Sequence, residues 1–216
     1  MIRFENVSHT YRKGDGVKNI SFEVSKGEFS FLIGPTGSGK TTIMKLIYGE
    51  LKPDSGTIIV NGQKLKNLKP RHLSKYRQDI GYIFQEYYLM PDRNLFQNIA
   101  LALHIVGVAK DEVEDRVMTV LEAVGLADKE LYFPKELSGG EQQRACIARA
   151  LVKEPEILLA DEPTGNLDPI TSFELLKLLN AINEDGTTVL MASHNYNLIK
   201  GQGRKIYEIT DGEMKT

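Results

Sequence analysis

The chain has 216 residues, of which 41% are hydrophobic and 26% charged, and its formal net charge is -2. This composition suits one globular domain, or one domain with a sizeable insertion. It argues against nucleic acid as the main partner, because nucleic-acid-binding proteins usually carry a basic surplus. The single cysteine, Cys146, excludes an internal disulfide and is typical of a reducing compartment.

The most apolar stretch, residues 99–109, has about half of the roughly 20 residues that a membrane-spanning helix needs. The first eleven residues lack the apolar core of a signal peptide. We therefore expect a cytoplasmic protein that contacts a membrane only through a partner.

In chain order, apolar and alternating runs predict strands over residues 2–11, 18–24, 27–34, 54–65, 79–85, 156–162 and 187–194, and a closing hairpin over 205–214. Within residues 54–65 the strand is predicted to end in an Asn-Gly turn, residues 61–62. A polar turn, residues 12–16, separates the first two strands, and a helix over residues 40–49 follows the third. The runs ending at Glu162 and His194 are apolar almost throughout, which is typical of strands buried on both faces of a parallel sheet.

Between Gln85 and Pro155 the pattern becomes helical, with an amphipathic helix over residues 111–125. Asp168 and Pro169 occupy the N-cap and first positions of another predicted helix, which runs toward Gly186. We therefore expect a single α/β domain, residues 1–216. Its predicted parts are an α/β core with an N-terminal antiparallel β subdomain, residues 1–85 and 156–216, and an inserted helical subdomain, about residues 86–155.

The sequence GPTGSGKT, residues 34–41, fits the G-x-x-x-x-G-K-[ST] pattern of loops that bind nucleoside triphosphates. Its glycines let backbone N–H groups face the phosphates, Lys40 supplies a positive charge, and the Thr41 hydroxyl can ligate Mg²⁺. An apolar strand precedes the loop and a helix follows it, as this motif requires. The candidate nucleotide-binding residues here are Gly34, Pro35, Thr36, Gly37, Ser38, Gly39, Lys40, Thr41 and Thr42.

Polar residues end three of the predicted buried strands, where a parallel sheet gathers its ligands. Asp161 is expected to hold Mg²⁺ through water, and Glu162 to polarise an attacking water. Gln85 and His194 end two further strands and can contact the γ-phosphate, the water or Mg²⁺. The predicted catalytic residues are Lys40, Glu162 and His194, and the predicted metal-binding residues are Thr41, Gln85 and Asp161.

A second stretch, LSGGEQQR at residues 137–144, also has the character of a phosphate site. Ser138 and Glu141 form an S-x-x-E capping box at the start of a helix that stops before Pro155. A hydroxyl, glycine N–H groups and the positive helix end converge there, which suits a γ-phosphate. A plain capping box would explain Ser138 and Glu141, but not Gly139 and Gly140.

Taken in order, Tyr11, GPTGSGKT, Gln85, LSGGEQQR, ILLADE, NLD and His194 resemble the nucleotide-binding subunit of ATP-binding cassette (ABC) systems over essentially the whole chain. The resemblance implies a P-loop ATPase that uses ATP and Mg²⁺. It also implies that Tyr11 stacks on adenine and that Asp168 lies at a dimer interface. In such a homodimer, each ATP lies between the glycine loop of one copy and residues 138–141 of the other.

The order LSGGEQQR then DEPTGNLD resembles the branch that works with lipoprotein-releasing, macrolide-export and cell-division membrane proteins. Residues 80–100 are most similar to the cell-division members, through Asp92-Arg93 and Phe96-Gln97-Asn98, although Pro91 and Asn94 depart from their pattern. This similarity implies an FtsX-type integral membrane partner that docks near Gln85–Asn98, on the inner face of the plasma membrane, and signals to cell-wall hydrolases.

Three other functions share parts of this pattern. One is the ATPase of a lipoprotein-releasing or macrolide-type exporter. Another is a DNA-maintenance ATPase, which would usually carry a long coiled coil or a basic face. The last is an ATP-gated scaffold that seldom hydrolyses its nucleotide.

Overall fold

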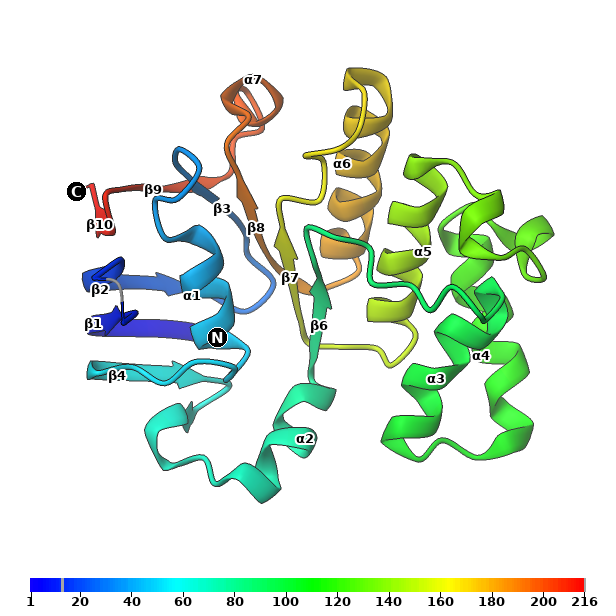
Figure 1. The fold of residues 1–216 in the computed structure, drawn as a ribbon, viewed down its shortest axis with the longest axis horizontal. Helices are drawn as coiled ribbons and strands as arrows, with labels where there is room; N and C mark the ends of the chain where they lie inside the picture. Colours follow the sequence, from blue (N-terminus) through cyan, green and yellow to red (C-terminus); the bar gives the residue numbers. More distant parts are fainter. Residues whose placement is uncertain (13, 216) are drawn as a thin grey trace.

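The computed structural model describes residues 1–12 and 14–215, and it contains two sheets (Figure 1). The smaller sheet is antiparallel, with the strand order β2-β1-β4-β5. Its strands are β1 (Ile2–Thr10), β2 (Gly16–Val24), β4 (Ser55–Val60) and β5 (Gln63–Lys64). This sheet is the antiparallel element that the N-terminal alternating pattern predicted.

The larger sheet has the order β10-β9-β3-β8-β7-β6, and it is parallel except for β10. Its strands are β3 (Phe29–Ile33), β6 (Ile80–Ile83), β7 (Ile157–Asp161), β8 (Thr188–Ser193), β9 (Lys205–Thr210) and β10 (Glu213–Met214). Every residue of β3, β6, β7 and β8 is buried, because helices cover both faces. Along β7, Leu158 and Ala160 belong to one core cluster, and Ile157 and Leu159 belong to the other.

Helix α1 (Lys40–Ile47) packs between the two sheets (Figure 1). Its apolar residues Ile43, Met44 and Leu46 share a core with β1, β2 and β4 on one side and with β7 and β8 on the other. The glycine loop, which precedes α1, is therefore fixed by packing against both sheets.

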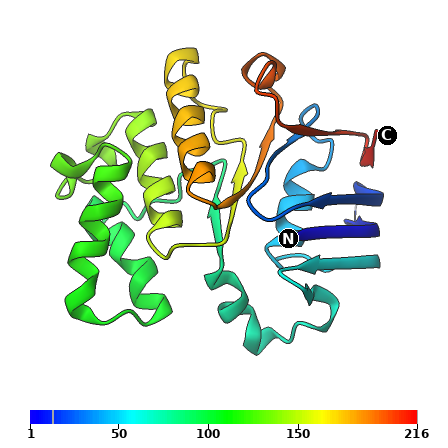
Figure 2. The ribbon, with the colours of Figure 1, turned by 180° about the vertical axis from the view of Figure 1, so that it is seen from behind.

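The other helices are α2 (Pro70–Gln78), α3 (Leu95–Val106), α4 (Lys110–Ala123), α5 (Gly139–Leu151), α6 (Pro169–Glu184) and α7 (Tyr196–Ile199), with the short 3₁₀ turns η1 (Leu65–Asn67), η2 (Ala127–Lys129) and η3 (Pro134–Glu136). Helices α3, α4 and α5 lie together at the end of the molecule opposite the antiparallel sheet, as both ribbon views show (Figures 1 and 2). None of the helices in the described part of the chain has the length and apolarity of a membrane span.

The predicted Asn-Gly turn is present: β4 ends at Val60, and Val60 pairs with Gln63 of β5 across Asn61-Gly62. Two other details differ from the sequence-based expectation. The strand expected over 79–85 ends at Ile83, so that Gln85 lies in the turn that follows. The sequence did not predict α2, because its apolar side consists of little more than Leu73 and Tyr76, of which only Tyr76 is buried. Lys13, part of the predicted turn over 12–16, lies outside the described residues.

Candidate functional site

The glycine loop joins β3 to α1 and folds around the side chain of Lys40. The Lys40 ammonium donates hydrogen bonds to the carbonyl oxygens of Gly34, at 2.8 Å, and Pro35, at 3.0 Å. Gly39 has φ 110, and a Cβ atom there would lie 2.6 Å from Cγ1 of Val17. Only glycine fits that position, so the loop keeps its shape because of both its backbone and its packing.

Asp161 ends β7 beside the first residues of α1. The Thr41 hydroxyl donates to its Oδ1 at 3.1 Å, and the Tyr82 hydroxyl donates to its Oδ2 at 3.3 Å. Burial raises the pKa of Asp161, and these two hydroxyl groups act in the opposite direction. A hydroxyl beside a carboxylate is a suitable donor pair for Mg²⁺, which is usually bound through one or two protein groups, phosphate oxygens and water.

The described residues contain no group of three or more His, Cys, Asp and Glu side chains able to hold a metal ion by themselves. A metal ion at Thr41 and Asp161 would thus depend on phosphate oxygens to complete its coordination, which fits the nucleotide site that the sequence predicted.

Glu162 connects the other two predicted catalytic residues. Its Oε1 lies 3.1 Å from the Lys40 ammonium, and its Oε2 lies 2.8 Å from Nδ1 of His194. Glu162 is 8% exposed and adopts a left-handed backbone conformation with φ 50. Such a conformation is unfavourable for a residue with a side chain and is concentrated at functional sites.

A cavity of about 690 Å³ joins these groups. It is lined by Tyr11, Arg12, Asp15, Gly16, Thr36, Gly37, Gly39, Lys40, Thr41, Thr42, Gln85, Glu162 and His194. The structure therefore brings five separate segments of the predicted site into one cavity, which we call the first pocket: Tyr11, the glycine loop, Gln85, Glu162 and His194. Tyr11 is 39% exposed at its edge, with its hydroxyl 3.4 Å from Oγ1 of Thr42.

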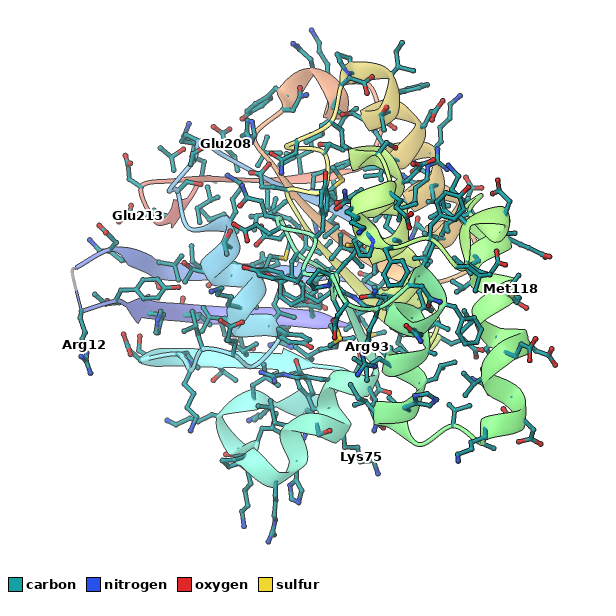
Figure 3. The ribbon with its side chains drawn as sticks, turned by 45° about the vertical axis from the view of Figure 1, so that its right-hand side comes forward. Arg12, Lys75, Arg93, Met118, Glu208 and Glu213 are labelled. Carbon is teal, nitrogen blue, oxygen red and sulfur yellow. The ribbon has the colours of Figure 1, made fainter. Side chains whose placement is uncertain are left out.

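Three residues of the first pocket, Arg12, Asp15 and Gly16, were interpreted from the sequence only as a turn. Arg12 projects from the connection between β1 and β2 (Figure 3). Their position directly after Tyr11, a predicted nucleotide-binding residue, is the signal that could have identified them.

A separate cavity of about 360 Å³, the second pocket, lies where α5 and α6 begin. It is lined by Ser138, Gly139, Gly140, Glu141, Arg144, Asn166, Leu167, Asp168, Thr171 and Glu174. The structure therefore brings Asp168 together with the LSGGEQQR segment, and this pocket shares no lining residue with the first pocket.

Both helix starts at the second pocket are capped as the sequence predicted. The Glu141 N–H donates to Oγ of Ser138 at 3.3 Å, and the Ser138 N–H donates to Oε2 of Glu141 at 2.8 Å. Asp168 accepts the N–H groups of Ile170 and Thr171, and the bonds from Thr171 are the main reason why the pKa of Asp168 is lowered.

Close packing between α5 and α6 accounts for Gly140. A Cβ atom on Gly140 would lie 2.7 Å from Cγ2 of Thr171, which is too close for a side chain. Gly140 therefore lets two capped helix ends come together at one cavity, a reason that the sequence alone could not supply.

A third cavity, of about 590 Å³, lies between the α2–β6 region and helices α3 and α5. Its polar cationic side chains are Arg77, Arg149 and Lys153, and its aromatic side chains are Tyr48, Tyr82, Phe84 and Tyr88. We call it the basic groove. Tyr88 places the groove next to the segment that follows Gln85, where the sequence suggested that a partner docks.

Comparison with known proteins is consistent with this geometry. The family model described as "ABC transporter" matches residues 17–165. The cell division ATP-binding protein FtsE of Escherichia coli (strain K12) is 45% identical over 215 residues, covering 99% of this chain and 97% of that protein. The FtsE protein of Bacillus subtilis (strain 168) is 42% identical over 213 residues, covering 98% of this chain and 93% of that protein.

Among solved structures, a dimeric ATP-binding cassette in a post-hydrolysis state, bound to ADP and Pi, superposes with a TM-score of 0.90. It is 34% identical, and the match covers 100% of this chain and 97% of that chain. The predicted P-loop fold is thereby confirmed. The chain belongs to the ABC transporter family, as an ATP-binding subunit that hydrolyses ATP.

Proposed function

We propose that this chain is the ATPase of a cell-division complex, in which two copies close on ATP and drive an FtsX-type integral membrane partner. That partner would pass the signal to cell-wall hydrolases outside the membrane. The relatives named FtsE support this proposal, because their similarity extends over nearly the whole chain.

One observation supports the proposed ATP-dependent dimer most directly. The first pocket holds the glycine loop and Glu162, whereas the second pocket holds Ser138 and Asp168, and the two have no lining residue in common. A two-fold related copy would bring its second pocket to face the first pocket of this one, because a two-fold interface uses the same surfaces twice. Two complete sites would then form only when both copies and both nucleotides are present.

The chemistry follows from the contacts of Glu162. Its carboxylate takes a proton from the attacking water, while His194, 2.8 Å from Oε2, holds the carboxylate in place. The water oxygen bonds to the γ-phosphorus, the bond to the bridging oxygen breaks, and ADP leaves with those electrons. Lys40 neutralises charge on the phosphate oxygens, and Mg²⁺ held near Thr41 and Asp161 would supply further positive charge.

The basic groove is the proposed docking site for the membrane partner. Its aromatic walls suit an apolar helix or turn, and Arg77, Arg149 and Lys153 suit acidic residues flanking it. Asn98 is buried and receives or donates hydrogen bonds with Met90, Arg93 and Asn94, which shapes the exposed turn next to the groove. Asp92 and Arg93 are exposed in this turn and would be available to the partner, and the hydrogen bonds give the asparagine of the aromatic-X-Asn run a structural role.

The dimer is tested with Glu162→Gln, which removes the proton acceptor but keeps the shape of the side chain. We expect hydrolysis to fall by about a hundredfold or more, because general-base catalysis contributes that much. ATP should convert this variant to a stable dimer in light scattering, whereas Glu184→Gln, at an exposed acid of α6, should behave like the parent. A Glu162→Gln variant that stays monomeric at saturating ATP would contradict the sandwich.

The partner is tested by purifying the complex from membranes and identifying what accompanies the chain. An FtsX-type protein is expected, and its recovery should fall when Tyr88 in the groove is replaced by aspartate. Recovery of an exporter permease instead would overturn the cell-division role and leave the ATPase intact.

A further inference from the structure

The second pocket is unusually acidic for a surface that meets a triphosphate. Three carboxylates line it, those of Glu141, Asp168 and Glu174, against one lining cation, Arg144. In the proposed dimer this pocket faces the γ-phosphate of the ATP that the other copy holds, so like charges would repel each other. Each carboxylate therefore needs compensation from nearby groups.

The carboxylates of Asp168, which caps α6, and of Glu174, which lies within α6, each have a compensating partner. Glu174 accepts from Nη2 of Arg144 at 3.0 Å. Asp168 accepts N–H groups from the first turn of α6, where the helix dipole favours a negative charge.

Glu141 is different, because it belongs to the segment that would touch the phosphate. Its Oε2 accepts both the N–H and the hydroxyl of Ser138, each at 2.8 Å. Its Oε1 contacts the ammonium of Lys129, which comes from η2 and does not line the pocket. The side chains of Lys129 and Glu141 are 27% and 26% exposed, so water only partly screens the pair.

The hydrogen bond from Lys129 is the largest cause that lowers the pKa of Glu141, to about 2. Glu141 is therefore a full negative charge at neutral pH, and the geometry places its balancing charge on Lys129.

We propose that Lys129 is a positioning residue of the second pocket: it cancels the charge of Glu141 and holds that carboxylate on Ser138, so that the pocket accepts the γ-phosphate carried by a second copy. This inference rests on the proposed ATP-dependent dimer. Lys129 itself need not touch the nucleotide, because it acts through Glu141.

The test uses Glu162→Gln as the common background, in which ATP should trap the dimer. We expect Lys129→Met to raise the ATP concentration for half-maximal dimer formation about tenfold. The reason is that repulsion between the γ-phosphate and an uncompensated Glu141 charge several ångströms away, at the protein surface, corresponds to about that factor in affinity. Lys129→Arg should keep the parent value, and Lys200→Met, at an exposed lysine near α7, is the matched control. ATP binding at protein concentrations too low for dimers should stay the same in all of them.

A second substitution separates charge from structure. Glu141→Gln keeps an acceptor for Ser138 and removes the charge, so adding it to Lys129→Met should restore dimer formation to within about twofold of Glu141→Gln alone. Raising the salt concentration should also shrink the Lys129→Met defect, because screening weakens repulsion. A merely structural role for Lys129 would show neither the rescue nor the salt effect.

The outcomes are distinct. If the background variant dimerises on ATP and Lys129→Met does so equally well, the inference is wrong and the proposed function stands. A defect that Glu141→Gln does not relieve also overturns the inference. If the background variant fails to dimerise, the proposed function is wrong, and this inference is wrong with it.

Discussion

The ion pair between Lys40 and Glu162 is nearly excluded from water, with 5% and 9% of the two side chains exposed. Glu162 also contacts His194, but Lys40 is its only fully charged partner among the described contacts. Removing one member of such a pair leaves an unbalanced buried charge, whereas removing both charges does not.

We therefore expect Lys40→Met to lower the free energy of unfolding by about 3 kcal/mol in the absence of nucleotide. The double variant Lys40→Met/Glu162→Gln should recover most of that loss. Urea denaturation followed by circular dichroism measures both. Equal stability of the single and double variants would show that the ion pair does not contribute as described.

Lys153 is a second partly buried cation, whose ammonium donates to the carbonyl oxygens of Arg77 and Ile80. Burial lowers its pKa from 10.5 to about 8. Between these two values the unfolded chain binds more protons than the folded chain, so the contribution of Lys153 to stability rises with pH.

The expected result is a difference between the parent and Lys153→Met that depends on pH. Relative to the variant, the parent should gain roughly 1 to 3 kcal/mol of unfolding free energy between pH 8 and pH 10.5. Lys200→Met, which removes an exposed lysine, should show the same change of unfolding free energy with pH as the parent.

At the level of helices and strands, the contact between α5 and α6 depends on the missing side chain of Gly140. Gly140→Ala should force apart the two helix starts, at a cost of about 1 to 3 kcal/mol. Thr171→Ser removes the methyl group in the way but keeps the hydroxyl that bonds to Asp168. The double variant should regain the lost stability in thermal unfolding. A double variant as unstable as Gly140→Ala would place the strain elsewhere.

Much of the architecture could be predicted because its signals are local. The continuous apolar runs of β7 and β8 showed their burial, and the caps at Ser138 and Asp168 showed where α5 and α6 begin. Helix α2 was not predicted, since its apolar side is only Leu73 and Tyr76, too few for a clear helical period among polar residues.

The site divides in the same way. That Lys40 and Thr41 lie beside Asp161 and Glu162 was predictable, because a glycine-loop pattern marks the first two and the end of an apolar strand marks the other two. Lys129 was not, because its partner Glu141 is twelve residues away and the contact depends on the turn between them. The division into an α/β core and an inserted helical subdomain, about residues 86–155, stays a prediction.

Over the whole molecule, α5 connects two of the cavities described above, the second pocket and the basic groove. Its first residues line the second pocket, and Arg149 and Ala150, near its end, line the basic groove. Arg149 donates to the carbonyl oxygens of Tyr87, at 2.9 Å, and Tyr88, at 2.6 Å, close after Gln85. Tyr88 is held there in a left-handed conformation with φ 46.

We expect Arg149→Met to loosen this connection, because no other single side chain type reaches two carbonyl oxygens with a planar fork. In the purified membrane complex, we measure the ATPase rate with the partner divided by the rate without it. This ratio should fall by about fivefold, the factor that corresponds to the lower end of usual coupling energies. Arg116→Met, on the exposed face of α4, is the control. An unchanged ratio would show that the coupling runs along another route.

A helix of 13 residues is about 20 Å long, so the two ends of α5 move as parts of one rod. Suppose that a partner in the basic groove makes it easier for two copies to close on ATP. Thermodynamic linkage then requires that closure on ATP raises the affinity for the partner by the same factor. ATP must then tighten the hold on the partner, although nucleotide and partner never meet. The membrane protein would sense each round of hydrolysis as a change in how firmly it is held.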